Sequence, residues 1–276
     1  MKRILVPSNC DLESERALRL AAELAVANHA HVYVLRVIKT HGGAYFDKQG
    51  DIVEDHAHDV QKYRDQKEQE TKNLHKWVTA IYPEAVQLVQ YGGIADTILD
   101  TIENLKIGLV IMGNRFTHDD EHRFFGTLTD YLIKRSKAPV LSLKSDIAHA
   151  SIKDIVFANE FNKPNQFFDA LQDLQQLTGA TVHLLRINTK KHNLTQEKIH
   201  KNMDQFAANN RLGKYEKNIH DAEEIEAGII EWVSKHPYPL LAVKNITRTR
   251  PSPLFRSKLS KKFFIRSSIS TLIFND

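Results

Sequence analysis

The feature that most constrains this sequence is an alternation of short apolar runs with helix-period stretches, which continues through the first half of its 276 residues. The expected strands of that half lie at residues 4–6, 31–37, 85–89, 109–112 and 139–143. The expected helices lie between them at 14–28, 53–82, 94–105 and 128–136. Such an alternation predicts an α/β fold with a parallel sheet and helices on both faces.

The second half repeats the apolar pattern in the same order. Residues 155–157 match 4–6, residues 182–187 match 32–37, and residues 240–243 match 109–112. The shared order favours duplication over a chance similarity of apolar strands, and so do Leu-Arg and Arg-Ser pairs at matching places. We therefore predict two homologous domains, at residues 1–146 and 152–276, with two separate sheets.

The composition excludes several classes of protein. The hydrophobic fraction is 42%, which is typical of a globular chain, and the net charge of +4 is too small for a chain devoted to coating nucleic acid. The lone cysteine, Cys10, cannot form an internal disulfide or a Cys-rich zinc site. The start has no signal-like apolar stretch, and the longest apolar run, near 107–113, is too short for a bilayer. We expect a cytoplasmic protein with no membrane partner.

The candidate site lies where the carboxyl ends of the first and fourth strands meet, since open α/β sheets bind ligands there. Residues 7–11 follow the first strand, Gly113 ends the fourth, and Gly126-Thr127 opens the next helix. Two glycines and a helix N-terminus can form an anion cradle. That they only permit turns remains an open alternative.

These segments resemble the universal stress protein family. The resemblance is carried by Ile4–Pro7, Val110–Gly113, Gly126-Thr127 and Ala138–Leu141, which match the family in order and spacing. It implies two tandem Rossmann-like (adenine nucleotide alpha hydrolase-like) domains, each an open five-stranded parallel sheet with helices on both faces. It also implies that they pack as an intramolecular version of the family dimer, a pseudo-dimer that could dimerise further.

The resemblance also implies a site for ATP or another adenine nucleotide in the first domain. The residues that correspond to the family's binding positions are Ser8, Asn9, Val37, Met112, Gly113, Arg115, Gly126 and Thr127. Two departures weaken this site: Asn9 stands where the family has Asp, and Phe116 stands for the middle glycine. Acidic residues at 119–121 further disfavour a polyphosphate. We expect a weak or vestigial nucleotide cleft.

The second domain departs further from the family pattern. Lys244 and Thr247 replace the first two glycines, and Ser257-Lys258 replaces Gly-Thr, so we expect no nucleotide cradle there. The segment 244–266 is instead basic, with Lys244, Arg248, Arg250, Arg256, Lys258, Lys261, Lys262 and Arg266 and no acidic residue. It could bind nucleic acid or another anionic partner, but a solvated helix face is the favoured interpretation.

The sequence offers no constellation of nucleophile, base and oxyanion donors. His118 and His122 do not form a convincing metal motif, and Cys10 is interpreted as a loop residue with redox sensing as a minor alternative. The leading hypothesis is a non-catalytic stress-response or regulatory protein that binds a small ligand, a protein partner or both, without metal. The competing hypothesis is a weak Mg²⁺-dependent ATP hydrolase or phosphotransferase that uses Gly113, Gly126 and Thr127.

Overall fold

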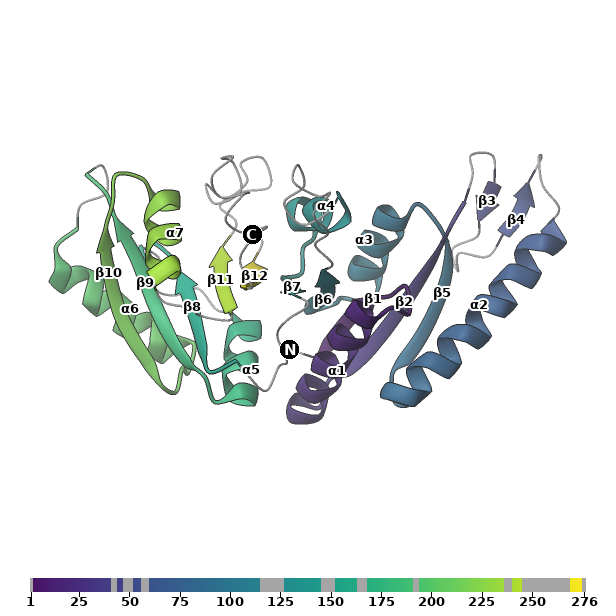
Figure 1. Cartoon of the computed structure of the whole chain (residues 1–276), viewed down its shortest axis with the longest axis horizontal. Coiled ribbons are helices and arrows are strands. Elements are labelled where there is room, and N and C mark those ends of the chain that lie inside the picture. Colours follow the sequence, from purple (N-terminus) through teal and green to yellow (C-terminus); the bar gives the residue numbers. More distant parts are fainter. Residues whose placement is uncertain are drawn as a thin grey trace.

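The chain forms one long twisted sheet with helices on both faces, as the computed structural model in Figure 1 shows. The described residues are 2–40, 44–46, 52–55, 60–114, 127–144, 152–162, 168–190, 194–235, 240–244 and 269–274. The elements of the first half are β1 (Arg3–Pro7), α1 (Leu12–Asn28), β2 (His31–Lys39), β3 (Ala44–Phe46), β4 (Ile52–Asp55), α2 (Val60–Ile81), β5 (Val86–Gly92), α3 (Ile94–Asn104), β6 (Leu109–Asn114), α4 (Thr127–Arg135) and β7 (Val140–Lys144). Those of the second half are β8 (Asp154–Ala158), α5 (Asp169–Thr178), β9 (Thr181–Asn188), α6 (Gln196–Asn209), β10 (Tyr215–Asp221), α7 (Ile225–Lys235), β11 (Leu240–Lys244) and β12 (Ser270–Phe274).

The main sheet has the strand order β10-β9-β8-β11-β12-β7-β6-β1-β2-β5. Within each half the neighbouring strands are parallel. Counted along the chain, both halves place their strands in the order third, second, first, fourth, fifth, from the outer edge inward. The predicted fold class, an α/β fold with a five-stranded parallel sheet in each half, is confirmed.

The strand registers of the two halves coincide. Ile4 of β1 pairs with Leu109 of β6, and their counterparts in the sequence repeat, Ile155 of β8 and Leu240 of β11, also pair. The same agreement holds for Ile4 with Val32 and Ile155 with Val182, and for Ile111 with Leu141 and Ala242 with Leu272. A register slip of one residue would turn every side chain to the other face, so this agreement supports the duplication.

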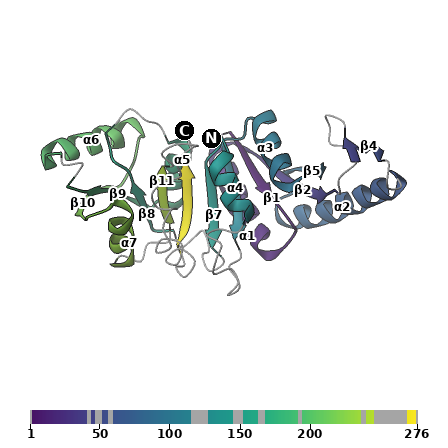
Figure 2. The same ribbon diagram turned by 90° about the horizontal axis from the view of Figure 1, so that it is seen from above.

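The two halves meet at one antiparallel pair among the described strands, β7 with β12, at the centre of the molecule (Figure 2). Leu141 faces Leu272 there, and these two residues are counterparts in the repeat, so the junction has the register of a two-fold pair. The expectation of two separate sheets is therefore wrong. Pairing leaves neither β7 nor β12 as an open sheet edge, and every residue of both strands is buried.

Both faces of the sheet carry a core that extends across the junction. Helices α1, α2, α5 and α6 cover one face, where Leu18 and Leu171 belong to the same buried cluster. Helices α3, α4 and α7 cover the other face, where Ile102 and Trp232 share a cluster (Figure 1). The halves thus bury apolar surface together, which is the dominant favourable contribution to folding.

One predicted helix is shorter than expected. The stretch 53–82 is not helical throughout: α2 begins at Val60, and Ile52–Asp55 instead pairs antiparallel with Ala44–Phe46 as the hairpin β3–β4. Ile52 and Val53 are β-branched, which favours extended backbone over helix. Among the described residues no helix is both long and apolar enough to cross a membrane.

Candidate functional site

The candidate site lies at the carboxyl ends of β1, β2 and β6. The sheet changes direction of strand order between β1 and β6, which is the place where such folds bind ligands. Ile4 pairs with Leu109 and Leu5 with Val110, and continuing this register places Ser8 level with Gly113. The structure thus brings together Ser8, Asn9, Met112 and Gly113, and Val37 extends from the neighbouring strand β2.

The loop after β1 is held by its own hydrogen bonds. The backbone N–H of Ser8 donates to the carbonyl oxygen of Leu35 at 2.9 Å, and that of Cys10 donates to Ser8 Oγ at 2.9 Å. The N–H of Asn9 donates to Ser14 Oγ at 3.2 Å. Three consecutive backbone donors are therefore already used, which reduces what the loop can offer to phosphate oxygens.

Helix α1 begins directly at this loop. Asp11 is its N-cap, and the carboxylate accepts from Ser14 N at 2.9 Å and from Ser14 Oγ at 2.6 Å. This cap fixes the start of α1 and with it the position of Asn9, whose N–H bonds to Ser14. Asp11 and Ser14 thus form one capping arrangement at the start of α1.

Gly113 is required by packing. A Cβ atom at this position would lie 2.1 Å from the carbonyl oxygen of Glu13 and 2.3 Å from its carbonyl carbon. The first turn of α1 therefore occupies the space beside Gly113 into which a side chain would project. The close backbone approach that the sequence assigned to a ligand is made by the protein itself, and a ligand contact at Gly113 stays a prediction.

A basic side chain that the sequence analysis did not select reaches this site. Arg36, on β2, donates from Nη1 to Asn9 Oδ1 at 2.6 Å and from Nε to Glu70 Oε2 of α2 at 3.1 Å. The signal was in the sequence, because the Leu-Arg pair at 35–36 recurs at 185–186. It supported the duplication, but its contact with the loop depends on the fold.

The second half keeps this arginine contact but closes the surrounding space. Arg186 donates from Nη1 to the carbonyl oxygen of Glu160, which corresponds to Asn9, and to Asn162 Oδ1 at 3.2 Å. Only 2% of Arg186 is exposed, and burial lowers its pKa. Phe161 corresponds to Cys10, and both residues have a left-handed φ, of 52° and 59°.

Phe161 belongs to an aromatic cluster that fills one face of the second half. Its ring contacts Phe157 and Phe206 edge-on, with centroid distances of 6.0 and 5.3 Å, and 1% of the residue is exposed. Phe168 and Phe274 extend the cluster. The residues that would correspond to a nucleotide cradle in this half, Thr247 and Ser257-Lys258, lie outside the described residues, so the expectation that it has none stays a prediction.

The remaining predicted residues differ in environment. Met112 is buried, with its sulfur 4.0 Å from Thr129 Oγ1, and Val37 is half-buried. Burial raises the pKa of the half-buried Cys10 thiol, which outweighs the opposing hydrogen bond to Ser8. A raised pKa lowers the thiolate fraction, which disfavours the minor alternative of redox sensing and agrees with the interpretation of Cys10 as a loop residue.

Several predictions fall outside the described residues: those on Arg115 and Gly126, on Phe116, on His118 and His122, and on the basic segment after Lys244. Thr127 begins α4, and its side chain is not described. Within the described ranges, no group of three or more His, Cys, Asp and Glu residues is placed to hold a metal ion.

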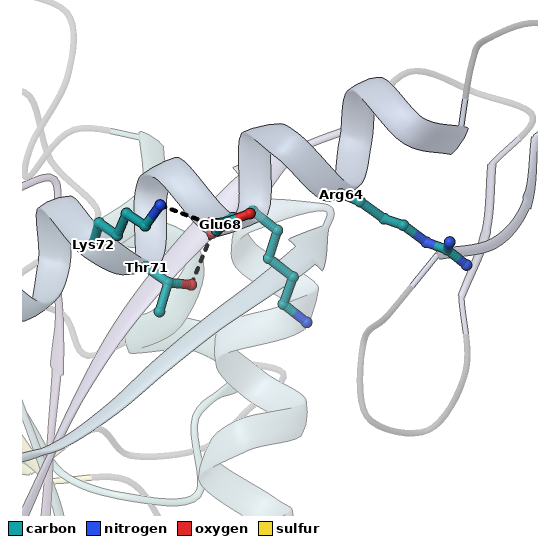
Figure 3. Close-up of a pocket in the computed structure, with 5 residues that line it drawn as sticks. Arg64, Glu68, Thr71 and Lys72 are labelled. Carbon is teal, nitrogen blue, oxygen red and sulfur yellow. Dashed lines mark hydrogen bonds and ion pairs between the residues drawn. The ribbon is translucent and has the colours of Figure 1, made fainter.

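A hollow of about 460 Å³ lies against α2 (Figure 3). Its lining is Arg64, Lys67, Glu68, Thr71 and Lys72. Lys72 pairs with Glu68 at 2.5 Å, and this ion pair lowers the pKa of Glu68. Because the lining comes from one helix face and is largely exposed, the hollow is open to solvent on its outer side.

Comparison with known proteins finds a family model that matches the first half and solved structures that share the fold of the whole chain. Residues 1–144 match the model of the universal stress protein family. A universal stress protein from Archaeoglobus fulgidus DSM 4304 has a similar structure over 99% of this chain and 98% of its own, with 14% identity and a TM-score of 0.72. A putative universal stress protein from Pseudomonas aeruginosa UCBPP-PA14 matches 100% of this chain and 93% of its own, with 12% identity and a TM-score of 0.60. No curated protein matches the chain.

Proposed function

Since the chain belongs to the universal stress protein family, we propose that it is a tandem member that acts by binding in stress response or regulation, without catalysis. Its two units are residues 1–146 and 152–276. The coincident registers of the two halves and their shared strand order support this division. The antiparallel β7–β12 pair joins the units as an intramolecular pseudo-dimer.

The ligand of the first unit is an adenine nucleotide, held weakly. The observation that supports this proposal is the change of strand order, which marks the ligand crevice of open α/β sheets: Ser8 and Asn9 follow β1 there, and Met112 and Gly113 lie at the end of β6. Apolar side chains with a few polar groups are typical of small-molecule sites, and Val37 and Met112 supply the apolar part for a base. Asn9 supplies amide donors.

The described backbone groups offer few hydrogen bonds to the phosphates of a nucleotide. The backbone donors of Ser8, Asn9 and Cys10 are used within the protein, and the first turn of α1 packs on Gly113. A triphosphate therefore gains few hydrogen bonds from this part of the crevice. We expect a dissociation constant in about the millimolar range, which corresponds to roughly −4 kcal/mol.

Calorimetric titration of the full chain with ATP, with and without Mg²⁺, and with adenosine tests this proposal. The variant Val37→Trp fills the crevice and should abolish binding, whereas Val86→Trp, at an exposed position of β5, should not. Failure of both ATP and adenosine to bind at about ten times the expected dissociation constant would refute nucleotide binding. Equal binding by the Val37→Trp variant would place the ligand elsewhere.

A further inference from the structure

The contact of Arg36 with Glu70 indicates what kind of ligand group the crevice accepts. Glu70 is a carboxylate supplied by α2, and it lies 3.1 Å from Arg36 Nε. Because an oxyanion already occupies this position, the geometry accommodates an oxyanion of a ligand in its place. Guanidinium groups hold carboxylate and phosphate oxygens through paired N–H donors.

Exchange of Glu70 for a ligand group has a low cost. The side chains of Arg36 and Glu70 are 24% and 26% exposed, so water reaches both and screens their attraction. Partly exposed ion pairs of this kind contribute little, on the order of 0.2–1 kcal/mol. Released from Arg36, Glu70 can be hydrated, because 26% of its side chain is already exposed.

Because Asn9 is uncharged, the positive charge of Arg36 is not neutralised once Glu70 is displaced. The side-chain oxygen of Asn9 accepts from Arg36 Nη1 at 2.6 Å but carries no charge. With an aspartate at this position, Arg36 would lie between two carboxylates, and loss of Glu70 would still leave it neutralised. The other acidic group nearby, Asp11, accepts the two capping bonds from Ser14.

The second half lacks this possibility. Arg186 is only 2% exposed, unlike Arg36. Its Nη1 donates to the carbonyl oxygen of Glu160 and to Asn162 Oδ1. An anion from solvent cannot reach it without displacing the loop. The two arginines are counterparts in the repeat, and only Arg36 is accessible.

We propose that Arg36 is a specificity-determining residue that makes the first-half crevice select a ligand with a phosphate monoester, which binds by displacing Glu70 from the guanidinium. This inference rests on the proposed function for the position of the crevice. It goes beyond that function because it assigns recognition of the anion to β2 and to an exchange with α2.

Titrations of the full chain with AMP, adenosine and inorganic phosphate test the proposal. We expect Glu70→Gln to bind AMP about two- to fivefold more tightly, because the competing carboxylate is removed. Arg36→Gln should bind AMP about tenfold more weakly, with adenosine unaffected by either change. Arg36→Lys keeps the charge but lacks Nε, so its affinity for AMP should lie between those of the natural chain and Arg36→Gln. Arg19→Gln, which removes an exposed arginine paired with Glu15, is the charge-matched control and should change nothing.

Inorganic phosphate separates this inference from the proposed function. Phosphate should shift the NMR signal of the Arg36 Nε–H group, and the shift should saturate at lower phosphate in Glu70→Gln. If adenosine and AMP fail to bind but phosphate still acts at Arg36, nucleotide binding is refuted and the anion site is supported. If AMP binds equally well to the natural chain, Arg36→Gln and Glu70→Gln, the anion site is refuted while nucleotide binding stands.

Discussion

Replacement of Gly113 by alanine should destabilise the protein through a clash with α1. The new Cβ would lie 2.1 Å from the carbonyl oxygen of Glu13 and 2.3 Å from its carbonyl carbon. Both atoms belong to the backbone of a capped first turn, so a side-chain rotation cannot relieve the overlap. Relief requires α1 to move away from β6 by roughly 1 Å, which also disturbs the apolar contacts of the helix. Overpacking costs typically 1–3 kcal/mol, and we expect about 3 kcal/mol here.

Urea unfolding of the natural chain and of Gly113→Ala measures this loss as a change in the unfolding midpoint at constant slope. Gly213→Ala is the matched control, because its Cβ would meet nothing closer than Gln175 Nε2 at 4.0 Å. We expect the control to stay within about 0.5 kcal/mol. If Gly113→Ala is as stable as the natural chain but loses nucleotide binding, the glycine serves a ligand and the packing argument is wrong.

Three further predictions concern the junction, the cysteine and an ion pair. Leu272→Asp places an unpaired charge at a fully buried position of the junction and should lower the free energy of unfolding in urea by at least about 3 kcal/mol. Val26→Asp, at a position that is 68% exposed, should be nearly neutral. Equal effects of the two changes would contradict a buried junction. Because burial raises the pKa of Cys10 above its ordinary 9.0, iodoacetamide should alkylate it more slowly than a free thiol at pH 8, and a faster reaction would refute this prediction. The hydrogen bond from Lys217 lowers the pKa of Asp204 below its ordinary 3.8. The contribution of this ion pair to stability is therefore present above pH 3.8 and is lost as the pH falls through the pKa of Asp204 in the folded protein. Asp204→Asn should weaken the acid dependence of unfolding, and an unchanged pH profile would argue against the pair.

The architecture could be predicted from the sequence because its buried strands are continuous apolar runs of strand length. The repeat could also be predicted, since matched pairs such as Ile4 and Ile155 have the same neighbours in the sheet. The joining of the two halves into one sheet could not be predicted. The apolar pattern of β7 and β12 fits a sheet edge covered by helices as well as a sheet edge paired with another strand. Only the register of Leu141 opposite Leu272 decides between these.

The place of the loop after β1 in the fold could be predicted from the sequence, but the contacts of its residues could not. The change of strand order locates the loop after β1 from topology alone. The reason for Gly113 depends on how closely α1 approaches β6, and the role of Arg36 depends on Glu70, which lies 34 residues further along the chain. Such pairings follow from tertiary packing, and local spacing carries no record of them.

We propose that a ligand binds the crevice of the first half and leaves the corresponding place in the second half empty. Methyl NMR during an AMP titration tests it most directly, since Val37 and Met112 have Ile187 and Val243 as counterparts in the repeat. Nucleotide binding in the first half alone should give saturable shifts of the Val37 and Met112 methyl signals, while those of Ile187 and Val243 stay in place. Shifts confined to the second pair, or of equal size in both, would contradict it.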